Sequence, residues 1–171
     1  NKPLYVEFNR HNPSSARITE ASVAEDLMIH DIDVVRHVLM GNNYTLSAGG
    51  TSDIVSALFK FNATPVYLSA SRKSSKKIRR IYIEEEDFTI EGDFMTQEIF
   101  TYFKPDKYNV ENERYVQENI IEKVMVNKVE PLKVELQTFL ECVKNRRPFP
   151  VTPEQATENL RICEEIKTYL N

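Results

Sequence analysis

The segment AEDLMIHDIDVVRHVLM, residues 24–40, decides how this chain is organised, because it is a helical stretch between two regions of strand character. Its apolar residues recur at the spacing of an amphipathic helix, and Gly41 stands where a glycine commonly ends one. Successive helical residues lie about 100° apart around the axis. On that spacing four ionisable residues share one narrow stripe: Asp26, His30, Asp33 and His37.

This stripe predicts a mostly buried helix whose polar side faces a cavity, since a solvated face is usually wide and rich in Lys and Glu. The four groups can satisfy one another in a core, although burying them without a function is costly. A carboxylate one turn before a His fixes its tautomer and raises its pKa, which suits a general acid/base. The same spacing also suits a divalent metal, and spacing alone leaves these readings open.

Strand signals surround the helix. Residues 3–9 predict a short strand and residues 10–22 an irregular stretch with turn formers. Downstream, β-branched and aromatic residues alternate with polar ones between Gly, Pro and Asn turns. The short connections indicate an antiparallel sheet. These strands are predicted over residues 44–48, 54–61, 66–71, 78–84, 88–91, 98–103 and 115–126.

Two helices are predicted at the C-terminal end. One begins near Pro131 and has apolar residues at helical spacing. The other begins at Thr152-Pro153-Glu154-Gln155, which has the spacing of a capping box. A helix, a meander and two helices together predict an α+β fold: a large, mostly antiparallel open-faced sheet with helices packed on one face.

The composition excludes several classes of protein. Of 171 residues, 41% are hydrophobic and 28% charged, which argues against disorder, and the net charge of −4 gives no general attraction to nucleic acid or membrane. Cys142 and Cys163 make no disulfide framework, so a cytoplasmic location is expected, with Cys163 in the core. The basic run from Arg72 to Arg80 is interpreted as a solvated hairpin.

Three motifs occur in one order along nearly the whole chain. They are an Asp-x-x-x-His-x-x-Asp segment (26–33), a Glu-Pro-Leu…Glu-Leu…Phe helix entry (130–139) and a Pro-x-x-Val-Thr-x-Glu-x-Ala segment (148–156). In this order they resemble the Gfo/Idh/MocA family of dehydrogenases. The resemblance implies that residues 1–171 are its C-terminal substrate-binding and oligomerisation domain, with the N-terminal Rossmann domain absent.

The resemblance also implies roles for single residues. His30 matches the family's general acid/base at a sugar hydroxyl, and Asp26 matches the carboxylate that supports it. Within the family, the sequence around these motifs is most similar to that of members that oxidise UDP-N-acetylhexosamine sugars. The residues expected to contact such a substrate are Arg10 and Arg17 at the diphosphate, and Asn12 and Asp33 nearby.

The cofactor is expected elsewhere, because the sequence has four glycines and no Gly-x-Gly-x-x-Gly. NAD or NADP would bind the full-length enzyme through its Rossmann domain, and this chain is expected to hold no cofactor and to be inactive alone. A sugar or nucleotide-sugar substrate and a homo-oligomer through the sheet face are implied, without nucleic acid or membrane. The alternatives are a stand-alone oligomeric binding or assembly module and a metal-dependent hydrolase.

Overall fold

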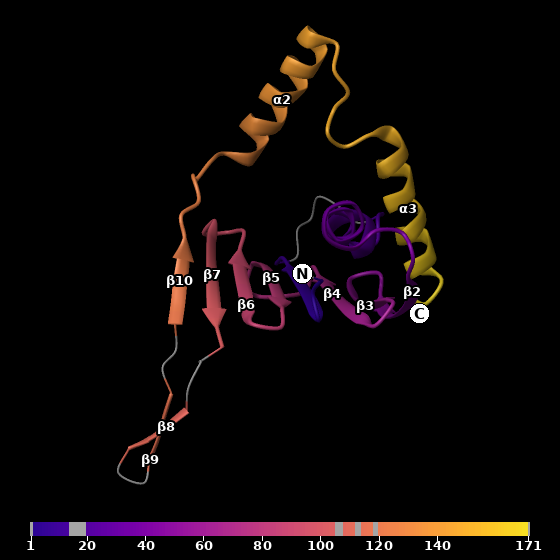
Figure 1. Cartoon of the computed structure of the whole chain (residues 1–171). Coiled ribbons are helices and arrows are strands. Elements are labelled where there is room, and N and C mark those ends of the chain that lie inside the picture. Colours follow the sequence, from indigo (N-terminus) through magenta and orange to yellow (C-terminus); the bar gives the residue numbers. More distant parts are fainter. Residues whose placement is uncertain (1, 14–19, 105–107, 112–113, 118–119, 171) are drawn as a thin grey trace.

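An open eight-stranded sheet forms the centre of the fold within residues 2–13, 20–104, 108–111, 114–117 and 120–170, which the computed structural model describes. A separate hairpin pairs β8 (Tyr108–Glu111) with β9 (Arg114–Gln117) (Figure 1). From one edge to the other the strands of the sheet are β10 (Ile120–Val124), β7 (Glu98–Phe103), β6 (Phe88–Asp93), β5 (Ile78–Glu84), β1 (Tyr5–His11), β4 (Thr64–Ser71), β3 (Ile54–Phe61) and β2 (Thr45–Thr51).

The pairing follows from the lengths of the connections. β2, β3 and β4 form a meander, as do β5, β6 and β7, and these neighbours are antiparallel because short turns join them. β1 and β4 are parallel, with Val6 opposite Val66 and Arg10 opposite Ala70. A parallel pair needs a long crossover, and residues 24–40 together with β2 and β3 supply it.

The two faces of the sheet differ in character. Along β3, Val55, Ala57, Phe59 and Phe61 are buried while the residues between them are exposed or half-buried. The same alternation runs through the neighbouring strands, because successive side chains of a strand point to opposite faces. The buried side forms the core and the other side remains open. Residues contributed to the core by β1 and β4 are Val6, Phe8, Val66, Leu68 and Ala70.

Residues 24–40 form one continuous helical segment over the core. Its middle, α1 (Ile29–Val34), is α-helical, and its ends, η1 (Ala24–Met28) and η2 (Val35–Met40), have wider π-type hydrogen bonding. α3 (Pro153–Lys167) lies beside it on the same face of the sheet (Figure 1). The segment buries mainly apolar side chains, among them Met28, Ile32 and Val35. α3 adds Ile162, Cys163 and Ile166.

α2 (Pro131–Asn145) is placed differently from the other helices. It extends away from the sheet (Figure 1) and buries none of its residues, although Leu136 and Phe139 lie on its apolar side. None of the helices in the described part of the chain is long and apolar enough to cross a membrane.

The predicted α+β architecture is confirmed, including the helix over residues 24–40 and the capping box of α3, in which the backbone N–H of Gln155 donates to Thr152 Oγ1. Gly41 ends the helical segment with a φ of 103°, a conformation that favours glycine. The single strand predicted over 115–126 is wrong, because β9 and β10 belong to different sheets.

Candidate functional site

The helical segment is fastened to the sheet by a buried ion pair. Arg10 Nε in β1 donates to Asp31 Oδ2 at 2.8 Å, and its Nη2 donates to Oδ1 at 2.5 Å. Asp31 is 2% exposed. A guanidinium that meets a carboxylate with two nitrogens holds it in a defined orientation. The pair therefore holds α1, which carries the neighbouring residue His30, against β1.

His30 lies exposed beside this ion pair. Surrounding protein still removes water from the imidazole, and this desolvation lowers its pKa; Arg10 and Arg79 lower it further. The nearby carboxylates Asp31 and Asp26 act in the opposite direction. Asp26 thus acts in the expected direction, but desolvation and the two arginines outweigh it and the net pKa is lowered. His30 is a neutral imidazole at neutral pH, and that form accepts a proton.

Asp26 lies one turn before His30 and is half-buried. Its backbone N–H donates to the carbonyl oxygen of Ser22 at 3.0 Å, and its carboxylate is near enough to His30 to favour the protonated imidazole. The two residues predicted as acid/base and support thus lie together.

The other half of the polar stripe contacts a different element. Asp33 Oδ1 accepts from Asn159 Nδ2 of α3 at 2.7 Å, and His37 Nε2 lies 3.3 Å from Asn159 Oδ1. The π-type ends of the segment change the angle between successive residues, so a uniform 100° spacing is not kept. Asn159 is 126 positions from Asp33 along the chain, and no local pattern indicates this contact.

The end of β1 and the start of β5 contribute two buried polar atoms, Asn12 Oδ1 and Arg79 Nε. Neither has a hydrogen-bond partner within the described part of the chain. Arg79 is opposite Arg10 in the ladder between β1 and β5. Desolvation, followed by the charge of Arg10, lowers the pKa of Arg79. Arg17, which was expected nearby, lies outside the described residues.

The basic run from Arg72 to Arg80 is only partly a solvated hairpin. Lys73, Lys76 and Lys77 are exposed as predicted. Arg72 is buried, and its Nε donates to Asp53 Oδ1 at 2.6 Å. Arg79 is half-buried because it alternates with Arg80 along β5. That alternation, which places Arg79 on the same side as Ile81 and Ile83, was a sequence signal for its position.

Metal binding was the open alternative for the Asp/His stripe. Across the residues that the structure describes, no group of three or more His, Cys, Asp and Glu side chains is arranged to hold a metal ion. Asp33 and His37 both contact Asn159 of α3, and the four members of the stripe do not form one such group.

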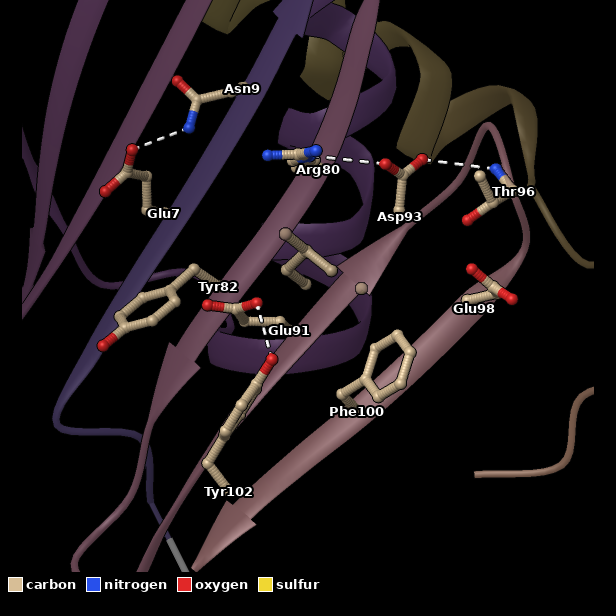
Figure 2. Close-up of a pocket in the computed structure, with 12 residues that line it drawn as sticks. Glu7, Asn9, Arg80, Tyr82, Glu91, Asp93, Thr96, Glu98, Phe100 and Tyr102 are labelled. Atoms are coloured by element: carbon tan, nitrogen blue, oxygen red, sulfur yellow. Dashed lines mark hydrogen bonds and ion pairs between the residues drawn. The ribbon is translucent and has the colours of Figure 1, made fainter. Parts of the chain in front are cut away.

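A hollow of ≈ 570 Å³ lies on the open face of the sheet, away from the candidate residues (Figure 2). In Figure 2 the helical segment of residues 24–40 runs behind the strands whose side chains line the hollow. Burial and the Glu7 carboxylate raise the pKa of Tyr5, beside the hollow, to about 12. Four carboxylates and one arginine line the hollow together with aromatic rings: Glu7, Glu91, Asp93, Glu98, Arg80, Tyr82, Phe100 and Tyr102.

Solved structures similar to this chain include dehydrogenases. A UDP-N-acetylglucosamine 3-dehydrogenase, GnnA, from Acidithiobacillus ferrooxidans is 24% identical with a TM-score of 0.82, covering 99% of this chain and 54% of its own. A second crystal form of that enzyme is 25% identical, with a TM-score of 0.80. Levoglucosan dehydrogenase in complex with NADH and L-sorbose is 12% identical with a TM-score of 0.73, covering 99% of this chain and 56% of its own.

A dehydrogenase (MviM) from Clostridium difficile is 15% identical with a TM-score of 0.63, over 98% of this chain and 55% of its own. This chain therefore spans about half the length of each of these enzymes. No protein-family model matches the sequence, and a comparison with curated proteins also finds no match.

Proposed function

We propose that this chain, whose structural neighbours are dehydrogenases of the Gfo/Idh/MocA type, is the substrate half of an NAD(P)-dependent sugar or nucleotide-sugar dehydrogenase. The observation that carries the proposal is the position of His30, near Asp26 and next in sequence to Asp31 of the buried arginine–carboxylate pair, where desolvation lowers the pKa of its imidazole. An oxidised hydroxyl must lose a proton as its carbon loses hydride, and a His with a lowered pKa accepts that proton at neutral pH.

The roles of the residues follow from their charges. His30 takes the proton from the hydroxyl, and Asp26 stabilises the imidazolium that results. The Arg10–Asp31 pair keeps His30 in place by fixing α1 to β1. A base held in position by its surroundings contributes about 10²- to 10⁴-fold to a rate.

The residues of this chain do not fit a dinucleotide, because its glycines, Gly41, Gly49, Gly50 and Gly92, do not form the Gly-rich turn that cradles a pyrophosphate. The proposal therefore places NAD or NADP, which accepts hydride when bound, on a nucleotide-binding domain that this chain meets. All proton handling falls to His30 and Asp26.

Nucleotide sugars are the proposed substrate class. UDP-N-acetylglucosamine is the first compound to test, because the neighbour with the highest TM-score among those described above is a dehydrogenase of that compound. Asn12, Arg17 and Asp33 are the proposed contacts, whereas Arg10, expected at the diphosphate, is already paired with Asp31. Asn12 carries a buried acceptor without a partner among the described residues. A sugar hydroxyl or amide N–H would satisfy that acceptor.

We also propose that copies of this chain pair through the open face of the sheet. Ile54, Leu58 and Ile121 are 47%, 43% and 54% exposed, and a broad apolar sheet face rarely stays in contact with water. Light scattering is expected to give a mass above one chain, and Leu58→Asp is expected to reduce it. A wild-type monomer at high concentration contradicts the pairing.

The catalytic proposal is tested by NMR titration of UDP-N-acetylglucosamine into this chain. The ring resonances of His30 are expected to move, whereas those of His11, which contacts Ser69 at the end of β1, are expected to stay. In the enzyme that includes the nucleotide-binding half, His30→Gln is expected to lower kcat by about 10²- to 10⁴-fold.

The alternative is an oligomeric binding or assembly module without catalysis, which the exposed apolar residues of the open face favour. That alternative gains if the sugar binds and chains pair, while the protein that includes the nucleotide-binding half shows no turnover. If the ring resonances of His30 do not move in the titration, His30 lies outside the substrate site and the catalytic proposal is overturned.

A further inference from the structure

We infer that Arg79 binds an oxyanion, a phosphate or a carboxylate, of the ligand that approaches His30. The inference rests on the proposed function for the place of the site, but it assigns to Arg79 a role that neither the sequence motifs nor the comparisons give it. It also assigns different roles to two arginines, Arg10 and Arg79, that are opposite one another on β1 and β5.

Arg10 already has its anion. Three hydrogen bonds join its guanidinium to the carboxylate of Asp31, at 2.5, 2.8 and 3.0 Å. Both side chains are largely shielded from water, with exposed fractions of 12% and 3%. A ligand that took Arg10 would leave Asp31 buried and unpaired, which is costly. The pair is therefore built to position the helix.

Arg79 has no such partner among the residues that the structure describes. Its Nε is buried and donates to no group in the described ranges. The nearest charges acting on it are Arg10, which repels it, and Asp31, which Arg10 has already neutralised. A buried guanidinium nitrogen without an acceptor is unfavourable. An incoming oxyanion would remove that cost and add a charge-assisted hydrogen bond.

A second unsatisfied atom lies close by. Asn12 continues the alternation of β1 beyond Arg10, so its side chain is on the same face as Arg10 and Arg79. Its backbone N–H donates to the Ser71 carbonyl at 2.7 Å, which keeps it in the extended line of the strand. Diagonal neighbours on one face of adjacent strands lie about 7–8 Å apart.

Asn12 Oδ1 needs a donor and Arg79 Nε needs an acceptor. The ligand that satisfies both carries an oxyanion next to a hydroxyl or an amide N–H. Phosphorylated sugars, nucleotide sugars and sugar acids have this chemistry, whereas a neutral sugar lacks the oxyanion. The inference thus narrows the proposed substrate class to anionic sugars.

The test uses this chain with four probes: UDP-N-acetylglucosamine, UDP, glucuronate and N-acetylglucosamine. UDP carries phosphate without the N-acetyl sugar, glucuronate carries carboxylate without phosphate, and N-acetylglucosamine is neutral. Each is titrated while the Nε–H resonance of Arg79 is followed by NMR. A downfield shift is expected with the anionic probe whose oxyanion reaches Arg79, and none with N-acetylglucosamine.

Variants supply a matched control. Arg80 is the next residue on β5, is on the open face, and pairs with Asp93 at 3.3 Å. Arg79→Gln is expected to weaken the binding of the anionic probe by about 10- to 100-fold, the effect of one hydrogen bond to a charged group. Arg80→Gln is expected to leave it unchanged. Arg79→Lys keeps the charge and is expected to recover part of the affinity. This variant tests the inference if Arg79→Gln fails to fold.

The outcomes separate this inference from the proposed function. If UDP-N-acetylglucosamine moves the His30 resonances but Arg79→Gln and Arg79→Lys bind it normally, the inference is overturned and the proposed function stands. If anions bind at Arg79 without affecting His30, Arg79 is still an oxyanion site, but its link to the ligand of His30 is overturned and the proposed function fails. Two results overturn the inference directly: no probe binds, or the Nε–H of the free chain is already hydrogen bonded.

Discussion

Removing Arg10 should reveal how much the buried ion pair contributes to the fold. In Arg10→Met the stem of the side chain is kept and the guanidinium is lost, so Asp31, 2% exposed, remains as a buried carboxylate without its three hydrogen bonds. Breaking a buried pair in this way costs about 3–5 kcal/mol.

The free energy translates into a measurable temperature shift. For a domain of about 150–250 residues, 1 kcal/mol changes Tm by about 2–4 °C, so a decrease of about 6–20 °C is expected. Thermal unfolding followed by circular dichroism gives Tm, and urea unfolding gives the free energy directly. The second route is needed because a loss of this size is a large fraction of the total stability of a domain.

Two companion variants make the reasoning testable. Arg80→Met removes the exposed Arg80–Asp93 pair, in which Arg80 is 61% exposed, and should cost less than about 1 kcal/mol. Arg10→Met combined with Asp31→Leu removes both charges and should recover most of the loss. The reasoning is refuted if Arg10→Met costs no more than Arg80→Met, or if the double variant is as unstable as the single one.

Three further outcomes are expected. Because the pKa of His30 is lowered on folding, the unfolded state takes up the proton first as pH falls. The free energy of unfolding should therefore decrease between about pH 7 and pH 5, and less so in His30→Gln. Equal pH dependence of this free energy in the two proteins, measured by urea unfolding, would argue against the shift. Burial raises the pKa of the Cys163 thiol to about 12, so a thiol reagent should label the half-buried Cys142 first and reach Cys163 only on unfolding; early labelling of Cys163 in the native chain would contradict its placement. Thr152→Ala should cost about 1 kcal/mol through loss of the α3 cap, whereas Thr157→Ala, an exposed position within the same helix, should change stability by less than about 0.5 kcal/mol; similar losses in both would show that the cap is not special.

Local patterns predicted most of the architecture correctly. The helical spacing over residues 24–40, the glycine that ends it and the capping box at Thr152 depend only on residues close together in the chain. The alternation of the strands is likewise local. The prediction failed at 115–126, because a run of β-forming residues does not show that β9 and β10 pair with different partners.

The candidate site was predicted in part. Solved structures that share the fold include dehydrogenases, the class that the resemblance implies, and Asp26 is near enough to His30 to act on its pKa. The net direction of the His30 pKa was missed, because it depends first on desolvation by the surrounding protein and then on Arg10 and Arg79, which lie on β1 and β5. The contact of Asp33 with Asn159 was missed for the same reason.

The sequence by itself determined most of the elements, their order and the family that the chain resembles, because hydrophobic period, caps and motifs are properties of neighbouring residues. Only the tertiary structure decided which arginine is neutralised and which is not: Arg10 meets Asp31, whereas the side chain of Arg79 meets no anion within the described residues. The physical reason is that a charge depends on whatever surrounds it in space. Those surroundings come from segments separated by tens of residues, which only the register of β1 and β5 beneath α1 brings together.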